Sequence, residues 1–284
     1  MQATIRFAIN RIAGSWMAFP AFAAMAQRLG VQAIELRNDL PAVELRDNTA
    51  PRTVGAIAAD HGLTIRAINA LQGFDQWTAR KQGEAAALAD YAAECGAQAL
   101  VLCPTNQRHD SRDPRQRHED LVHALHGLQP VLTGRRLTGL IEPLGFEECA
   151  VRRKSQARRA IDDLGPQTPF ALVHDTFHHH LAGEPDIYPQ STGLVHVSGV
   201  DDPSLQVAQM RDPHRLLVGP NDRLGNVAQL RQLLAHGYEG YVSFEPFADS
   251  VTQERDIERR LRDSIDYLSA AVAASTGTEG NSVR

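Results

Sequence analysis

Four potential metal ligands stand near the ends of four successive apolar segments in the second half of the chain. They are Glu142 in "LIEP", Asp175 in "LVHDT", His196 in "LVHVSG" and Glu245 in "SFEP". Each residue alone could equally cap a helix or pair with an arginine. Three carboxylates and one imidazole that converge would repel one another without a cation, and this donor set suits Mn²⁺, Mg²⁺, Co²⁺ or Zn²⁺ better than copper. The recurrence in four consecutive segments therefore favours one divalent metal site.

The segment "HDTFHHHLAG" adds four histidines beside one of these acids. His178 follows Asp175 by three residues, so we expect it to reach the same cavity and contact a substrate. His174 precedes the acid, and strand alternation turns it to the opposite face, where we expect a structural histidine packed against helices. We expect His179 and His180 to lie on the outer side, without a role in the site.

The elements that must position these side chains are short β-rich segments alternating with helical patterns. Helical patterns such as "EAAALADYAAECGA" and "NVAQLRQLLAHG" lie between them, and several end in glycine, as helix C-termini often do. The eight expected strands are Thr4–Asn10, Ala33–Asp39, Thr64–Ala70, Ala99–Thr105, Leu137–Pro143, Phe170–Thr176, Gly193–Gly199 and Tyr241–Phe247.

This alternation predicts a parallel sheet covered by helices. Eight such units in 284 residues fit an α/β protein of the (β/α)8 TIM barrel type. An open doubly wound sheet is the alternative, but it usually has a glycine-rich loop after its first strand, where this chain has "NRIAGSW". We expect one barrel over residues 1–273 and a disordered polar tail over residues 274–284.

The first four strands also end in polar residues. In a barrel the active site lies at the C-terminal ends of the strands. We therefore expect Asn10, Arg37 and Asn69, with Asn106, to donate hydrogen bonds to substrate hydroxyls. Turn or capping roles are equally open for Asn10 and Asn106, and Arg37 could simply pair with Asp39.

Composition narrows the range of partners. A net charge of −5 and a pI near 6.2 offer no footprint for nucleic acid or an anionic membrane. The basic segment Val151–Arg159 is interpreted as a solvated helix face. Three cysteines without a CxxC pair, and no apolar segment typical of a signal peptide or a membrane span, favour a cytoplasmic protein with reduced thiols. A homo-oligomer remains open.

These strand ends resemble the xylose-isomerase-like barrels, a superfamily that includes sugar isomerases, ketose 3-epimerases and hydroxypyruvate isomerases. The likeness lies in "IEP", "HDTFHHH", "VHVSGVDD" and "FEP". The chain is most similar to the inosose (2-keto-myo-inositol) isomerases, on "FAINR", "IELRNDLP", "INALQGFDQWT", "VLCPTN", "EPLGFEECAVR" and "LLVGPNDRLGN". This resemblance covers nearly the whole chain except the tail.

The resemblance implies one divalent ion held by Glu142, Asp175, His196 and Glu245. It also implies that the two glutamates act as an acid/base pair in proton transfer. A carboxylate and a Lewis acid are what the removal of a poorly acidic C–H proton requires.

The same resemblance implies contacts to the substrate. His178 would meet a substrate oxygen, as the histidine three positions after the aspartate does in the epimerases. The epimerases' Arg-x-Pro-Pro-Gly segment is replaced here by "RLLVGPNDR". Arg223 is therefore a candidate substrate contact, and Arg215 is the other arginine that could take that place.

The implied activity is an isomerase that moves a ketone along a polyol ring through an enediolate, converting 2-keto-myo-inositol to 1-keto-D-chiro-inositol in inositol catabolism. Ketose 3-epimerase, hydroxypyruvate-type isomerase and inosose dehydratase activities on the same metal site are alternatives. A metal-dependent nuclease of the endonuclease IV type is disfavoured by the acidic composition. A non-catalytic sugar-binding barrel is the remaining alternative, although binding alone would not need both Glu142 and Glu245.

Overall fold

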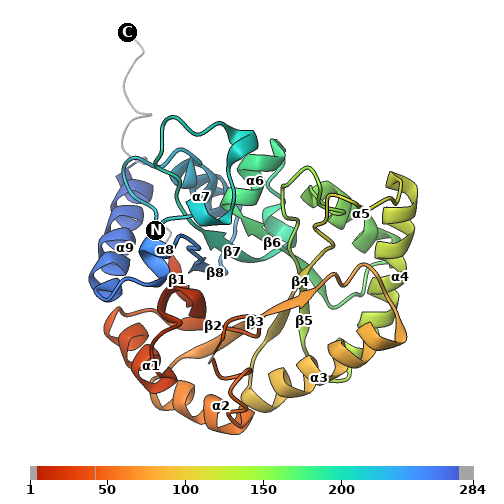
Figure 1. Ribbon diagram of the computed structural model, residues 1–284, viewed down its shortest axis with the longest axis horizontal. Helices are drawn as coiled ribbons and strands as arrows, with labels where there is room; N and C mark the ends of the chain where they lie inside the picture. The colour runs from red at the N-terminus through yellow and green to blue at the C-terminus, as the bar shows by residue number, and fades with distance from the viewer. Residues whose placement is uncertain (1–4, 42, 275–284) are drawn as a thin grey trace.

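The eight expected strands close into a barrel in the computed structural model, which describes residues 5–41 and 43–274 (Figure 1). Each strand pairs in parallel with the next, and β8 pairs with β1. The strands are β1 (Arg6–Asn10), β2 (Ala33–Arg37), β3 (Thr64–Gln72), β4 (Ala99–Cys103), β5 (Thr138–Ile141), β6 (Phe170–Asp175), β7 (Thr192–Val197) and β8 (Tyr241–Phe244). The expected (β/α)8 TIM barrel is confirmed.

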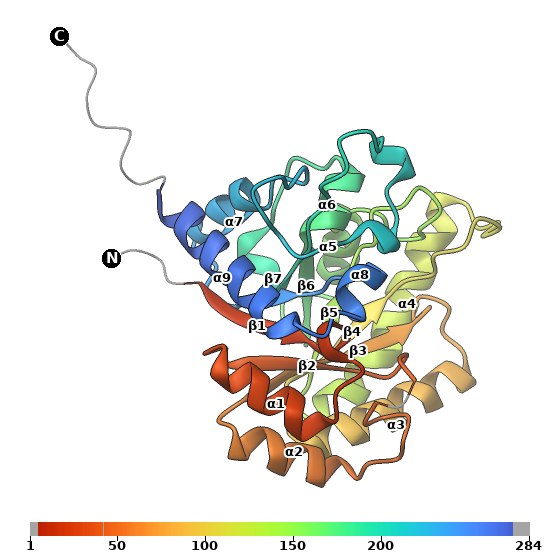
Figure 2. The same cartoon turned by 60° about the vertical axis from the view of Figure 1, so that its left-hand side comes forward.

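Helices surround the barrel on its outside, and the turned view shows the same ring from the side of α1 and α9 (Figures 1 and 2). They are α1 (Phe19–Arg28), α2 (Pro51–Asp60), α3 (Ala79–Cys95), α4 (Pro114–Thr133), α5 (Lys154–Asp163), α6 (Thr176–Ala182), α7 (Asn226–Ala235), α8 (Asp249–Thr252) and α9 (Ile257–Ala273). Short 3-10 helices are η1 (Arg11–Gly14), η2 (Pro189–Ser191), η3 (Val207–Gln209) and η4 (Asp212–His214).

Strand alternation divides the apolar residues into two layers. On β7, Val195 and Val197 pack outward against the helices, whereas Leu194 points into the barrel with alanines, valines and Leu140 of other strands. His196 lies between the two valines and therefore also points inward. Toward the N-terminal ends of the strands the barrel interior is a packed apolar core. Toward their C-terminal ends it is filled by buried polar side chains.

Two strands end just before the glutamates that the sequence singles out. β5 ends at Ile141 and β8 at Phe244, because the prolines after Glu142 and Glu245 cannot donate to the sheet. The backbone N–H groups of both glutamates still donate to the neighbouring strand, at 3.0 Å in each case. Both carboxylates are thus anchored to the sheet itself.

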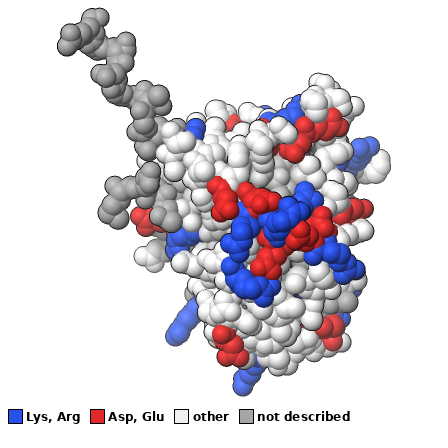
Figure 3. Space-filling model, turned by 90° about the vertical axis from the view of Figure 1, so that its left-hand side faces the viewer, with Lys and Arg blue, Asp and Glu red and all other residues white. Residues whose placement is uncertain are grey.

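The outer surface carries both signs of charge. Along α9 and between α1 and α9, ion pairs join Arg28 to Glu258, and Arg259 to Asp256 and Asp263. Figure 3 shows the side of the molecule on which α1 and α9 lie, with basic and acidic side chains next to one another. This face does not offer the continuous basic surface that a phosphate backbone requires.

Within residues 5–41 and 43–274, no helix combines the length and the apolar character needed to cross a membrane. The expected disordered tail falls, apart from Ala274, outside the described residues.

Candidate active site

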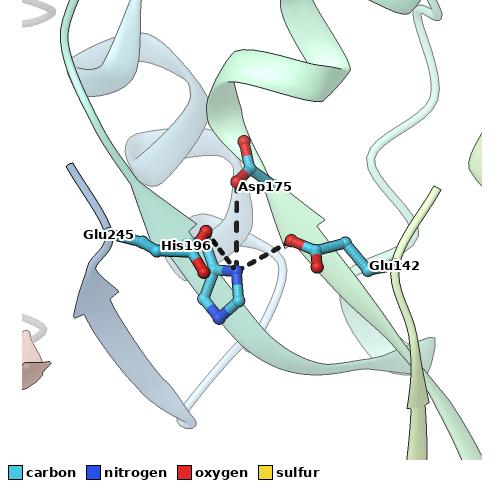
Figure 4. A group of neighbouring side chains, drawn as sticks. All are labelled: Glu142, Asp175, His196 and Glu245. Carbon is cyan, nitrogen blue, oxygen red and sulfur yellow. Dashed lines mark hydrogen bonds and ion pairs between the residues drawn. The ribbon is translucent and has the colours of Figure 1, made fainter. Parts of the chain in front are cut away.

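The four expected metal ligands meet at the C-terminal end of the barrel (Figure 4). One ligand atom from each of Glu142, Asp175, His196 and Glu245 lies within 4.8 Å of the other three, and all four residues are buried. The Nδ1 atom of His196 lies 2.8 Å from Glu142 Oε1, 3.2 Å from Glu245 Oε2 and 3.9 Å from Asp175 Oδ2. The imidazole therefore points its Nδ1 edge at all three carboxylates.

Asp175 is held by the helix that follows it. Its Oδ1 accepts hydrogen bonds from the backbone N–H groups of Phe177 (2.8 Å) and His178 (3.0 Å), so that it caps the N-terminus of α6. Its Oδ2 faces the ligand cluster and accepts a hydrogen bond of 2.6 Å from Arg215. One carboxylate thus serves the fold with one oxygen and the cluster with the other.

Glu245 is surrounded by donors. Oε1 accepts from Arg37 (2.8 Å) and Asn10 (3.2 Å), and Oε2 accepts from Arg215 (3.0 Å). Burial opposes ionisation, but His196 and the two arginines outweigh it and hold the pKa of Glu245 well below its usual value. Glu245 is therefore fixed in its charged form.

Glu142 has a sparser environment. Its Oε1 faces His196, and its Oε2 accepts a hydrogen bond of 3.4 Å from the Cys103 thiol. Burial and the nearby Glu142 and Glu245 carboxylates raise the pKa of Cys103 well above its usual value, which keeps the thiol protonated as a donor. Among the described residues, no arginine or lysine makes an ion pair with Glu142.

His196 has a fourth carboxylate on its other edge. Its Nε2 lies 3.2 Å from Glu35 Oε2, and neither residue is exposed. Burial favours a neutral ring, but Glu245, Glu35 and Glu142 outweigh it and raise the pKa of His196 well above its usual value. These carboxylates therefore favour the charged form of the ring.

The donor set fits a divalent cation. Two ligands of one ion are separated by at most about 4.4 Å, twice the usual ligand distance of roughly 2.2 Å. The four atoms here all lie within 4.8 Å of one another, which is close to that limit. Three hard oxygens and one imidazole nitrogen match Mn²⁺, Mg²⁺, Co²⁺ or Zn²⁺. The residues present thus suit the ion that the sequence predicts.

A cavity of about 230 Å³ opens directly above the cluster. Of the residues predicted to contact a substrate, Arg37, Asn69 and His178 line this cavity, together with Asn106. His178 is buried, packs edge-on against Phe146 and has no hydrogen-bond partner at Nδ1 among the described residues. An unpartnered buried donor or acceptor beside a cavity is the group that a ligand would satisfy.

Of the predicted substrate contacts, Arg223 and Asn10 do not line this cavity. Arg223 lies outside it and donates to the backbone oxygens of Asp202 and Leu205. Arg215 occupies the cavity wall instead and bridges two carboxylates of the cluster. The sequence left open whether Arg215 or Arg223 faces the cavity, and its position in the structure favours Arg215.

Asn10 also lies outside the cavity lining. Its Oδ1 accepts the Ile12 N–H at the start of η1, and its Nδ2 donates to Glu245. Its contacts are those of a capping residue that also orients a carboxylate of the cluster. Asn69 lines the cavity, but its Nδ2 donates to Glu35 at 2.7 Å.

His174 faces away from the cluster, as expected from strand alternation. Its Nε2 meets Gln229 Oε1 and its Nδ1 meets Lys154 Nζ, both at 2.8 Å. Burial, with Lys154 and His179 nearby, lowers the pKa of His174 well below its usual value. His179 stacks on His174 at 4.8 Å between ring centroids, and neither His179 nor His180 lines the cavity.

Lys154 corrects the interpretation of the basic segment as a solvated helix face. It lies on α5 with 3% of its surface exposed, and burial lowers its pKa to about 7. An isolated buried ammonium is costly, so the lysine side chain is neutral above about pH 7. Its amine donates a hydrogen bond to His174.

Sequence reasoning missed Glu35 and did not single out Cys103 as a partner of Glu142. Glu35 has a signal that could have found it, because a glutamate between two buried residues of a parallel strand is costly unless it is paired. Cys103 has no such signal, since a buried cysteine is ordinary in a core.

A xylose isomerase domain containing protein from Salmonella typhimurium LT2 is similar in both sequence and structure, with 32% identity, a TM-score of 0.85, and coverage of 93% of this chain and 97% of that chain. The IolI protein crystallised with a zinc atom has 17% identity and a TM-score of 0.81, with 95% and 99% of the two chains covered. D-psicose 3-epimerase from Clostridium cellulolyticum H10, crystallised with D-tagatose, has 14% identity and a TM-score of 0.74, with 94% and 99% covered.

A search of curated proteins gave no match. Residues 23–271 match the model of one protein family, described as the xylose isomerase-like TIM barrel, and this match includes all four members of the ligand cluster. Together with the closed barrel and the 32% identical relative, the match places this chain in the xylose isomerase-like TIM barrel family.

Proposed function

We propose that this protein is a divalent-metal-dependent isomerase that moves a ketone along a polyol ring, with 2-keto-myo-inositol as substrate and 1-keto-D-chiro-inositol as product. The observation that carries the proposal is the buried cluster of Glu142, Asp175, His196 and Glu245 at a cavity of about 230 Å³ that is lined by both polar and apolar side chains. The inosose substrate rests on the resemblance of the sequence to the inosose isomerases.

A divalent ion held by the cluster would act as a Lewis acid on the substrate oxygens and so make the neighbouring C–H proton easier to remove. The proteins with bound zinc and with D-tagatose on the same fold support an ion and a small keto-sugar as the two components.

We assign the proton transfer to Glu142. A general base must be able to accept a proton, and arginines that donate to a carboxylate oppose this. Arg37 and Arg215 hold Glu245 in its charged form, whereas Glu142 is contacted by His196 and a neutral thiol. Glu142 would take the proton from the CHOH carbon and return it to the former carbonyl carbon, while the hydroxyl proton passes to the former carbonyl oxygen. Glu245, held in its charged form by Arg37 and Arg215, would help to hold the ion.

The residues of the cavity wall would orient the substrate. The open Nδ1 of His178 would bind a substrate oxygen, and Arg37 and Asn106 supply further polar groups. The main role of Arg215 would be to hold Asp175 and Glu245 in place from the cavity wall, not to contact the substrate ring.

The test is exchange of deuterium from D₂O into the ring carbons of 2-keto-myo-inositol by Mn²⁺-loaded protein, followed by NMR. We expect exchange with wild type, its loss in Glu142→Gln, and its retention in His180→Asn, a control on α6 outside the cavity. No exchange on the inosose, together with turnover of a ketose, would replace the proposal with the second candidate, a ketose 3-epimerase. The epimerases of the same fold favour that candidate. Inertness toward both substrate classes would favour a non-catalytic sugar-binding barrel.

A further inference from the structure

Glu35 is a buried carboxylate that none of the roles above uses. It lies in the middle of β2, between Ile34 and Leu36, which pack outward in the apolar layer. Its side chain points into the barrel and is fully buried. A carboxylate in this position costs free energy unless strong partners compensate for the loss of water.

Its partners are His196 and Asn69, and both contact the same oxygen. Glu35 Oε2 lies 3.2 Å from His196 Nε2 and 2.7 Å from Asn69 Nδ2. The other edge of the His196 ring faces the acids of the cluster through Nδ1. The imidazole is therefore held between one carboxylate on its Nε2 edge and three on its Nδ1 edge.

We propose that Glu35 is the positioning residue of His196: it accepts the Nε2–H hydrogen bond, which fixes the tautomer and the rotation of the ring so that Nδ1 is presented to the metal ion. Asn69 holds Glu35 in place for this task. The inference rests on the metal-dependent function proposed above. A carboxylate behind a ligating histidine fixes its tautomer and raises its strength as a ligand.

Position supports this role over a contact with the substrate. Glu35 is not part of the cavity lining, whereas Asn69 is. Asn69 thus connects the cavity wall to His196 through Glu35. A substitution of Asn69 would therefore lower activity partly by weakening metal binding, and not only by removing a contact with the substrate.

A glutamine at this position separates charge from shape. Glu35 Oε1 lies near the Ser243 hydroxyl, which helps to lower the pKa of Glu35, but makes no hydrogen bond of ordinary geometry among the described residues. In Glu35→Gln the amide oxygen can keep both hydrogen bonds to His196 and Asn69, while the NH₂ group takes the place of Oε1 and can donate to the Ser243 hydroxyl. The variant therefore removes the negative charge and keeps the shape of the side chain.

The experiment is to measure the affinity of the metal-free protein for Zn²⁺ by competition with a chelator. We expect Glu35→Gln to bind about 10- to 100-fold more weakly than wild type. Excess metal should restore part of its turnover, which a general loss of structure would not allow. Glu44→Gln is the matched control, because Glu44 is an equally buried glutamate that pairs with Arg11 instead. It should keep the wild-type affinity for Zn²⁺ even if its thermal stability falls.

The outcomes separate this inference from the proposed function. If wild type fails to bind Zn²⁺, Mn²⁺ or Co²⁺, the proposed metal-dependent function falls and this inference falls with it. If wild type binds and Glu35→Gln binds equally well, only the positioning role is overturned. Should Glu35→Gln not fold, Asn69→Ala tests the same support with the charge retained, and unchanged Zn²⁺ affinity there would overturn the role as well.

Discussion

His174 and His196 lie on neighbouring strands, and both are fully buried, yet their surroundings are opposite. His196 points into the barrel, where carboxylates surround it and raise its pKa. His174 points outward toward α5 and α7, where Lys154 and Gln229 contact it and burial lowers its pKa.

One step of strand alternation accounts for this difference. Residues on one face of a buried strand reach the polar upper interior of the barrel, and those on the other face reach the packed helix layer. The crowd of histidines in "HDTFHHHLAG" therefore contributes an acid, Asp175, to the cluster, while the imidazole of the cluster comes from the next strand. Neighbours, not residue type, decide which buried histidine can serve an ion.

Replacing each ring in turn is the strongest test of this contrast. His196→Gln should lower kcat roughly 1,000-fold or more, because it removes a proposed ligand of the metal ion, which would contribute several kcal/mol to stabilising the transition state. His174→Gln should keep turnover and lose about 1–3 kcal/mol of unfolding free energy, because its buried partners lose hydrogen bonds. Steady-state kinetics and urea unfolding of both variants check this. Equal losses of turnover would contradict the contrast.

The partners of the cluster offer a second test. Arg215→Lys should lower kcat about 100-fold, because lysine cannot bridge Asp175 and Glu245 as the guanidinium does. Arg223→Lys is the control in the same loop region, and we expect less than about a twofold change, since Arg223 contacts backbone oxygens outside the cavity. Steady-state kinetics of both variants, measured in parallel, show which arginine turnover depends on. A larger effect at Arg223 would show that Arg223, not Arg215, is the arginine on which turnover depends.

The pH dependence of metal affinity sharpens the comparison further. In the metal-free protein, the raised pKa keeps His196 protonated at neutral pH, so an ion at Nδ1 must displace a proton. The affinity should therefore fall as pH falls, by about tenfold per pH unit for one proton. Zn²⁺ titrations between pH 6 and 8 measure this slope. His174→Gln should leave it unchanged, because that ring is already neutral; a flat profile in wild type would contradict the assignment.

Lys154, the partner of His174, provides a test through stability rather than through turnover or metal binding. Its pKa in the folded protein is lowered to about 7, while the unfolded lysine titrates near 10.5. Between these values only the unfolded chain holds the proton, so wild-type stability should rise with pH relative to Lys154→Met, by up to about 1.4 kcal/mol per pH unit. Urea unfolding at pH 7, 8 and 9 compares the two. Parallel curves would show that the lysine is not neutral in the fold.

The sequence predicts the frame of the molecule well for a physical reason. Buried parallel strands must be apolar and helices must carry an apolar face, so all eight strands and the order of the barrel are evident from the residues alone. The strand-end residues that converge, Glu142, Asp175, His196 and Glu245, are predictable because alternation and order around the barrel fix their position.

Residues that lie in a loop, on a helix or in the middle of a strand cannot be assigned to the site by strand order and alternation. Arg215 follows β7 in an irregular loop, and only the folded chain shows its guanidinium reaching Ser198 and the cluster. Lys154 appears in a basic segment, and only the fold shows its contacts with His174 on β6 and with the loop after α6, at Glu184 and Ile187. Glu35 lies in mid-strand, where a search of strand ends does not look.

The anchoring of Glu142 and Glu245 has a consequence for redesign. Both acids are fixed by hydrogen bonds of the sheet before the chain turns away at a proline, whereas His178 belongs to a helix beyond its strand. Arg215 comes from a loop but is bound to the cluster, so it belongs with the anchored acids. A redesign that varies the cavity wall at His178 would therefore leave both anchored carboxylates and their arginine in place.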